Sequence, residues 1–159
     1  MTGPKPKSGK SAGTATRPAP LVAAFAYFAL VFATGFILGT VRVLALEPLL
    51  GDVGSVALEL PVMLAVSWIA SRGICRRLNV PARLAPRIFM GGVAFALLIA
   101  AELILSVYVF GQGVGAWVGS LGTAAGLLGL AGQVGFGLIP AIQAALRLDI
   151  VACDYRRTH

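Results

Sequence analysis

The chain has 159 residues, of which 58% are hydrophobic and 12% are charged, and its net charge is +7. A water-soluble domain of this size needs more polar surface to cover its core, so the apolar excess indicates contact with lipid. The cations lie between apolar blocks and are not interleaved with aromatic residues, which argues against nucleic acid as a partner.

Taken in order, the chain begins with a polar tail and continues with four apolar segments. Residues 1–20 are rich in Pro, Gly, Ser, Thr and Lys, and we expect a disordered basic cytoplasmic tail. The apolar run that follows exceeds the roughly 7 to 15 residues of a signal-peptide core, so we expect it to be retained. The four expected spans form a transmembrane domain over 21–147, and a short cytoplasmic tail follows at 148–159. Each span is long enough to cross about 30 Å of hydrocarbon, and they cover 21–44, 53–71, 88–110 and 118–146.

The second span is the least apolar of the four. Its eight Val, Leu and Ile residues contribute roughly 3 to 4 kcal/mol to insertion, against up to about 3 kcal/mol lost at Glu59. Pro61 either starts this helix or kinks it, and the sequence leaves both open. The second span therefore needs its neighbours for stable insertion. The fourth span is the longest, which predicts a tilt or a break near Pro140.

The basic residues indicate orientation. Of the thirteen Lys and Arg residues, only Arg42 lies outside the N-terminal tail, the connection between spans two and three, and the C-terminal segment. Four spans place those regions on one side, and Lys and Arg favour the cytoplasmic side. We therefore predict an all-α membrane protein, a bundle of four transmembrane helices with both termini in the cytoplasm. Anionic lipid headgroups, or alternatively an acidic partner, would face the basic loop, which contains Arg72, Arg76, Arg77, Arg83 and Arg87.

Glycines recur at a spacing that lets helix backbones approach closely. Gly35 and Gly39 form a G-x-x-x-G pair in the first span. The fourth span carries Gly122, Gly126 and Gly129 on roughly one stripe, which continues through Gln133 to Gly137 and Pro140. We expect both faces to pack inside the bundle, with a homodimer seam as the alternative.

Intramembrane charges are costly, so they usually face the protein interior and pair. The predicted topology places Arg42, Glu59 and Glu102 in the outer half of the membrane, and Gln133 faces the same interior from the fourth span. We hypothesise that Arg42 bridges Glu59 and Glu102 and so ties three helices together. Alternatively, two carboxylates around one guanidinium leave one acid able to carry a proton or bind a cation, as a transporter requires.

No combination of residues typical of an active site is present. Cys75 and Cys153 are far apart, and the only histidine is His159, so neither a Cys/His pair nor a metal site is indicated. We expect no enzymatic activity, no cofactor and no metal. The outer connection contains Glu47-Pro48 and Gly51-Asp52, which predict a turn.

Two short patterns carry a resemblance. G-x-x-x-G-x-x-R over 35–42 is followed by E-x-P-x-M-L over 59–64. Over these first two spans the chain resembles a family of uncharacterised small bacterial inner-membrane proteins with four spans, and this likeness implies neither an activity nor a binding residue. Small multidrug transporters also have four spans and a membrane carboxylate, but their carboxylate lies in the first span, where this chain has none.

Three classes of function follow. We expect a non-enzymatic structural membrane protein or an accessory subunit of a larger membrane complex. The alternative is a small proton- or cation-coupled transporter that uses the outer-leaflet cluster.

Overall fold

The computed structural model describes the backbone of residues 19–109, 111 and 113–158 and the side chains of this part through residue 146. The expected tail at 1–20 therefore lies almost wholly outside the described residues. Every regular element in the described part is a helix. In chain order these are α1 (Ala19–Val41), the π-helical turn η1 (Arg42–Leu46), α2 (Glu47–Arg77), α3 (Leu84–Ile104), the π-helical turn η2 (Leu105–Val109), α4 (Val114–Ser120) and α5 (Ala124–Thr158).

Three helical stretches in the described part are long and apolar enough to cross a membrane: Ala19–Arg77, Leu84–Val109 and Ala124–Leu146. The expectation of a helical membrane protein is confirmed at this level. The first stretch has 59 residues, which as a straight helix would measure about 90 Å, roughly three times the hydrocarbon thickness. It contains both of the first two predicted spans.

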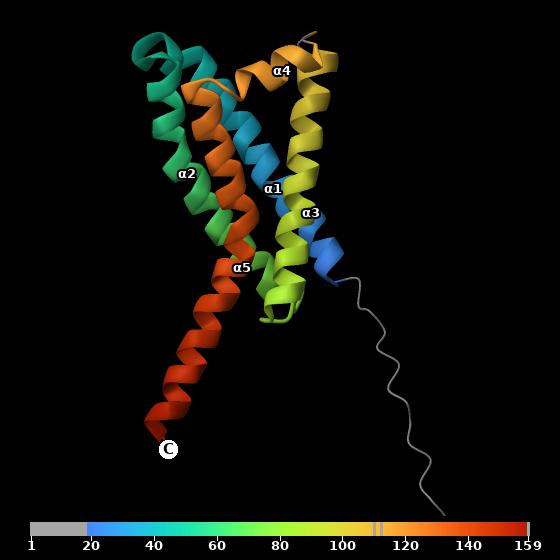
Figure 1. Ribbon diagram of the computed structural model, residues 1–159, viewed down its shortest axis with the longest axis vertical. Helices are drawn as coiled ribbons and strands as arrows, with labels where there is room; N and C mark the ends of the chain where they lie inside the picture. Colours follow the sequence, from blue (N-terminus) through green and yellow to red (C-terminus); the bar gives the residue numbers. More distant parts are fainter. Residues whose placement is uncertain (1–18, 110, 112, 159) are drawn as a thin grey trace, which may run out of the picture.

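This stretch changes direction at Gly51. Its backbone angles are φ 71° and ψ 174°, a region that only glycine enters readily because it has no Cβ. Beyond Gly51, α2 returns alongside α1 (Figure 1). The expected turn at 47–52 is therefore a helical corner, in which Pro48 lies in the first turn of α2, where a missing N–H does no harm.

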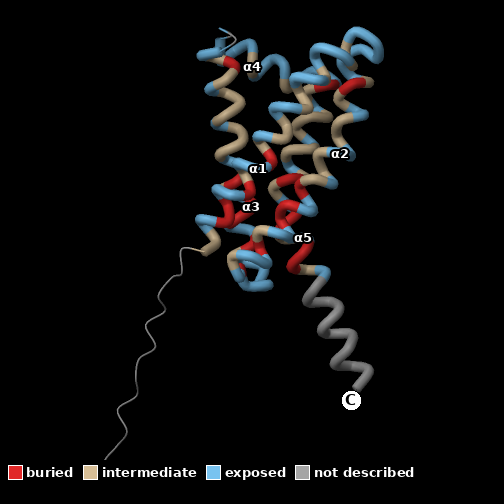
Figure 2. The backbone as a smooth tube through the Cα atoms, turned by 180° about the vertical axis from the view of Figure 1, so that it is seen from behind, coloured by how far each residue is buried: buried red, intermediate tan, exposed pale blue. Residues whose placement is uncertain are grey.

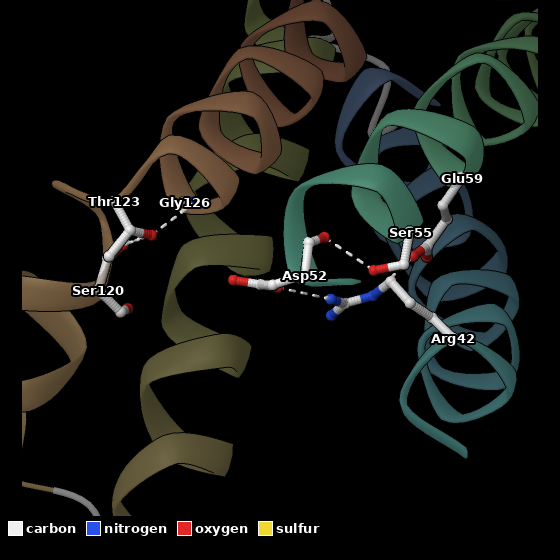
Figure 3. Close-up of polar contacts among 7 residues, drawn as sticks. All are labelled: Arg42, Asp52, Ser55, Glu59, Ser120, Thr123 and Gly126. Carbon is white, nitrogen blue, oxygen red and sulfur yellow. Dashed lines mark hydrogen bonds and ion pairs between the residues drawn. The ribbon is translucent and has the colours of Figure 1, made fainter. Parts of the chain in front are cut away.

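The helix limits decide one question that the sequence left open and differ from the predicted spans in two places. Pro61 lies inside α2 and does not start it. The connection between the third and fourth predicted spans contains the start of α4. The long helix of the fourth span begins at Ala124, where the Thr123 hydroxyl accepts a hydrogen bond from the Gly126 N–H, as an N-cap does (3.0 Å; Figure 3). Residues 148–158, expected as a tail, continue α5.

Among the long helices, α2 and α3 each pack against both α1 and α5. Figure 2 shows that most buried residues gather toward the end with the α2–α3 connection. The core there contains Ala23, Tyr27, Val31, Met90, Ala94 and Phe136. Large apolar side chains also point outward from each long helix, among them Ile37, Ile69, Ile104 and Leu138. An outward apolar surface of this kind fits contact with lipid chains.

Candidate functional site

An ion pair crosses the corner at Gly51. Arg42 lies on η1 before the corner and Glu59 lies on α2 after it, so the change of direction brings the two side chains together (Figure 3). Arg42 Nε lies 2.9 Å from Glu59 Oε2, and the two side chains are only 26% and 17% exposed. The pairing of Arg42 with Glu59 agrees with the hypothesis.

Asp52, which was not among the predicted cluster residues, makes a second and weaker contact with Arg42. Its Oδ1 lies 3.7 Å from Arg42 Nη1, and the Asp52 side chain is 58% exposed. Exposed ion pairs of this length contribute little to stability. The Asp52 backbone carbonyl also accepts a hydrogen bond from the Ser55 hydroxyl at 2.8 Å. The one sequence signal for Asp52 was its position in the predicted outer turn, beside Gly51.

Glu102 takes a different partner. Gln133 Nε2 on α5 donates a hydrogen bond to Glu102 Oε1 on α3 at 2.6 Å. Among the described residues no ion pair joins Arg42 to Glu102, so the structure holds two separate pairs and no bridge. Depth in the membrane suggested that all three charges meet, but depth does not specify which way a side chain points around its helix. Because α5 packs against α3, Gln133 reaches Glu102.

The Glu102–Gln133 pair contains one acceptor that receives no hydrogen bond from the described residues. Gln133 Oε1 is buried and has no hydrogen-bond partner among the described residues. A buried acceptor without a donor lowers the stability of a protein by about 1–3 kcal/mol. Here this acceptor belongs to the same side-chain amide that donates a hydrogen bond to Glu102.

The predicted packing glycines occupy several environments. A Cβ on Gly35 would lie 3.1 Å from Met63 Cε, whereas one on Gly39 or Gly129 would have no neighbour within 4 Å. Gly122 and Gly126 lie against the turn that precedes α5, near the carbonyl oxygens of residues 119 and 120. These two glycines therefore shape a local turn and do not pack against another long helix.

Two long helices approach closely at Gly91 of α3 and Gly137 of α5. A Cβ on Gly91 would collide with the Gly137 carbonyl oxygen. Gly132 is similarly close to the Leu60 side chain of α2. Sequence reasoning placed Gly137 on the stripe of the fourth span but missed Gly91, which is not part of a G-x-x-x-G pair.

A tyrosine in the core binds the backbone near Pro140. Pro140 has no N–H to donate to the carbonyl four residues earlier, that of Phe136. The Tyr27 hydroxyl of α1 donates a hydrogen bond to this carbonyl at 2.9 Å. The Tyr27 and Phe136 rings are also stacked, with centroids 4.5 Å apart. The proline was the available signal, because a freed carbonyl in an apolar interior requires a donor.

The basic loop contains two kinds of arginine. Arg72, Arg76, Arg77 and Arg83 are exposed, as expected for residues that face headgroups. Arg87 is buried, and its Nη2 and Nε donate hydrogen bonds to the carbonyls of Val80 and Pro81, each at 3.2 Å. Arg87 thus departs from the lipid-facing position expected for it, because its guanidinium satisfies backbone carbonyls of the α2–α3 connection.

A polar bridge joins α2 to α5 near the same end. The Ser71 hydroxyl donates to Gln143 Oε1 at 3.0 Å, and Gln143 Nε2 donates to the Trp68 carbonyl at 2.8 Å. Both Ser71 and Gln143 are buried. Of the two cysteines, Cys75 is buried and not in a disulfide, while the Cys153 side chain lies outside the described part.

The described residues contain no group of three His, Cys, Asp or Glu side chains that could hold a metal ion. No protein-family model, curated protein or solved structure matches this chain.

Proposed function

We propose that the chain is a multi-pass protein of the bacterial inner membrane, which it crosses four times with both termini in the cytoplasm. The corner at Gly51 supports this count because it divides the 59-residue stretch into two antiparallel arms. The start of α1, the α2–α3 connection and the end of α5 lie toward one end of the molecule (Figure 1). The basic loop is at that end, which the positive-inside rule assigns to the cytoplasm.

Its role, in this proposal, is structural or accessory and not enzymatic. The observation that carries this role is the separation of the intramembrane polar residues into two pairs. Arg42 with Glu59 links the two arms of the first stretch, and Gln133 with Glu102 links α5 to α3. Each pair neutralises or satisfies a polar group that would otherwise be costly in lipid, and each fixes two helical segments relative to one another.

Glu59→Gln tests the structural role of the first pair. The substitution leaves the Arg42 guanidinium with only its longer, exposed contact to Asp52, and we expect the free energy of unfolding in detergent to fall by about 1–3 kcal/mol. Asp52→Asn is the matched control, since it removes the longer and exposed contact of the same guanidinium, and we expect a change of about 0.5 kcal/mol or less. Equal effects of the two substitutions would contradict a stabilising role for the Glu59 pair.

An accessory role also predicts a stable partner. Mild detergent extraction of the tagged chain from its native membrane should yield a complex in which a second membrane protein is present in a fixed ratio. Isolation of the chain alone at every detergent strength would leave only the structural role.

A proton- or cation-coupled transporter is the second candidate. It is favoured by the buried Gln133 Oε1, an acceptor without a donor on the side chain that binds Glu102. Transport predicts that liposomes containing the purified chain dissipate a pH or cation gradient faster than protein-free liposomes, and that Glu102→Gln abolishes this flux while the protein remains folded. Wild-type flux equal to that of empty liposomes would reject this candidate.

A further inference from the structure

A cavity of about 600 Å³ lies at the end of the molecule that carries the α2–α3 connection. Its walls come from α2, the connection, the start of α3 and α5. This volume is in the range of sites for small ligands. The cavity includes none of the residues of the Arg42–Glu59 or Glu102–Gln133 pairs.

Two arginines form one wall. Arg72 and Arg76 are four residues apart on α2 and so lie on the same helix face, with Trp68 one turn before them. Both arginines are exposed, and neither forms an ion pair with a described residue. Like charges at this spacing repel each other. An anion between the two guanidinium groups would remove that repulsion.

A third arginine also lines the cavity. Arg87 lines it from α3, and hydrogen bonds to the carbonyls of Val80 and Pro81 hold its side chain in place. Gln143 lines it from α5 and is held by Ser71 and the Trp68 carbonyl. The described lining residues include no carboxylate. The cavity therefore combines the guanidinium groups of Arg72 and Arg76 with polar side chains that hydrogen bonds hold in place.

We propose that this cavity binds a phosphate group, either the headgroup phosphate of an anionic phospholipid or free inorganic phosphate. The planar guanidinium donates paired hydrogen bonds that match phosphate oxygens. Basic pockets between transmembrane helices at the cytoplasmic side suit anionic headgroups, and a tryptophan at the rim suits headgroup depth. The site is distinct from general attraction to the basic loop, because Arg77 and Arg83 belong to that loop but do not line the cavity.

The emission of Trp68 provides the readout. The chain has two tryptophans, so Trp117→Phe leaves Trp68 in the cavity as the only one. This variant, purified in neutral detergent, would be titrated with phosphatidylglycerol, with phosphatidylcholine and with inorganic phosphate, using chloride at equal ionic strength as the salt control. We expect a saturable change with phosphatidylglycerol or with inorganic phosphate, but not with phosphatidylcholine or chloride. Saturation by phosphatidylglycerol alone identifies a lipid headgroup, and saturation by inorganic phosphate identifies a free anion.

Paired substitutions assign the site. Arg72→Gln with Arg76→Gln should weaken binding by about tenfold or more, whereas the matched pair Arg77→Gln with Arg83→Gln should leave it within about twofold of the parent. If the first pair does not fold, Arg72→Lys with Arg76→Lys keeps both charges, removes both guanidinium groups and should still weaken binding severalfold. Equal responses to phosphatidylglycerol and phosphatidylcholine, no saturable response to either phosphate probe, or equal losses in the two Gln pairs would overturn the proposal.

Discussion

The hydrogen bond from Tyr27 to the Phe136 carbonyl shows how a single residue can stabilise a helix to which it does not belong. Pro140 removes a donor from the middle of α5, and Tyr27 of α1 supplies one at the carbonyl concerned. In lipid no water is available to do this. Tyr27 is fully buried and stacks on Phe136, so its ring and its hydroxyl both bind α5.

Tyr27→Phe keeps the ring and removes the donor. We expect the free energy of unfolding to fall by about 1–2 kcal/mol, because the Phe136 carbonyl loses its side-chain partner. Tyr108→Phe removes a hydroxyl from a residue that is 83% exposed and should have no measurable effect. Unfolding of both variants by titrated denaturing detergent, followed by circular dichroism, measures the difference. Equal stability of Tyr27→Phe and the parent would mean that another group satisfies this carbonyl.

The chemistry of individual residues was enough to predict which polar side chains form pairs, but not the partner of every one of them. The cost of burying charge was enough to single out Arg42, Glu59, Glu102 and Gln133. The partner of Glu102 depended on rotation about each helix axis and on which helices are neighbours, and neither is contained in the sequence of one span. The sequence also gave no reason to connect Tyr27 with Pro140, which lie in different helices.

Helix packing depends on where glycine brings two backbones together. Contact between Gly91 of α3 and Gly137 of α5 leaves no room for a Cβ. The G-x-x-x-G pattern pointed to Gly35 and Gly39, of which only Gly35 has a neighbour within 4 Å of a Cβ. Spacing identifies a smooth helix face, but it does not determine whether another helix or lipid covers that face.

Gly91→Ala should destabilise the protein, whereas Gly92→Ala should not. A methyl group at Gly91 must displace the α5 backbone, so we expect a loss of about 1–3 kcal/mol. Gly92, the next residue, has nothing within 4 Å of a Cβ, so alanine there should be neutral or add up to about 1 kcal/mol through its higher helix propensity. Thermal unfolding in detergent compares the two, and a similar effect at both positions would contradict close α3–α5 packing.

At the scale of the whole molecule, hydropathy and charge predicted the helical class and the approximate position of each long helix. These quantities are sums over many residues, so local errors matter little. Hydropathy and charge did not predict features that depend on a few residues. A helical corner at Gly51 stands where a turn was expected, and α5 begins at Ala124, directly after the N-cap residue Thr123. The helix at 114–120 was missed because its short glycine-rich sequence has low helix propensity.

Fusion reporters test the four-pass proposal. Green fluorescent protein at the N-terminus, after Asn79 or after His159 should fluoresce, because all three sites are assigned to the cytoplasm. Alkaline phosphatase after Gly113 should be active, because that site is assigned to the opposite side. A chain in which Ala19–Arg77 crossed only once would place the N-terminus and Asn79 on opposite sides.

The helical corner at Gly51 also constrains biosynthesis. Because synthesis runs from the N-terminus, Arg42 leaves the ribosome before its partner Glu59 does. Until Glu59 follows, the Arg42 guanidinium at the far end of the first arm lacks its paired carboxylate. The less apolar second arm then arrives carrying the matching carboxylate, so entry of the two arms into the bilayer as one hairpin is favoured over their entry one at a time.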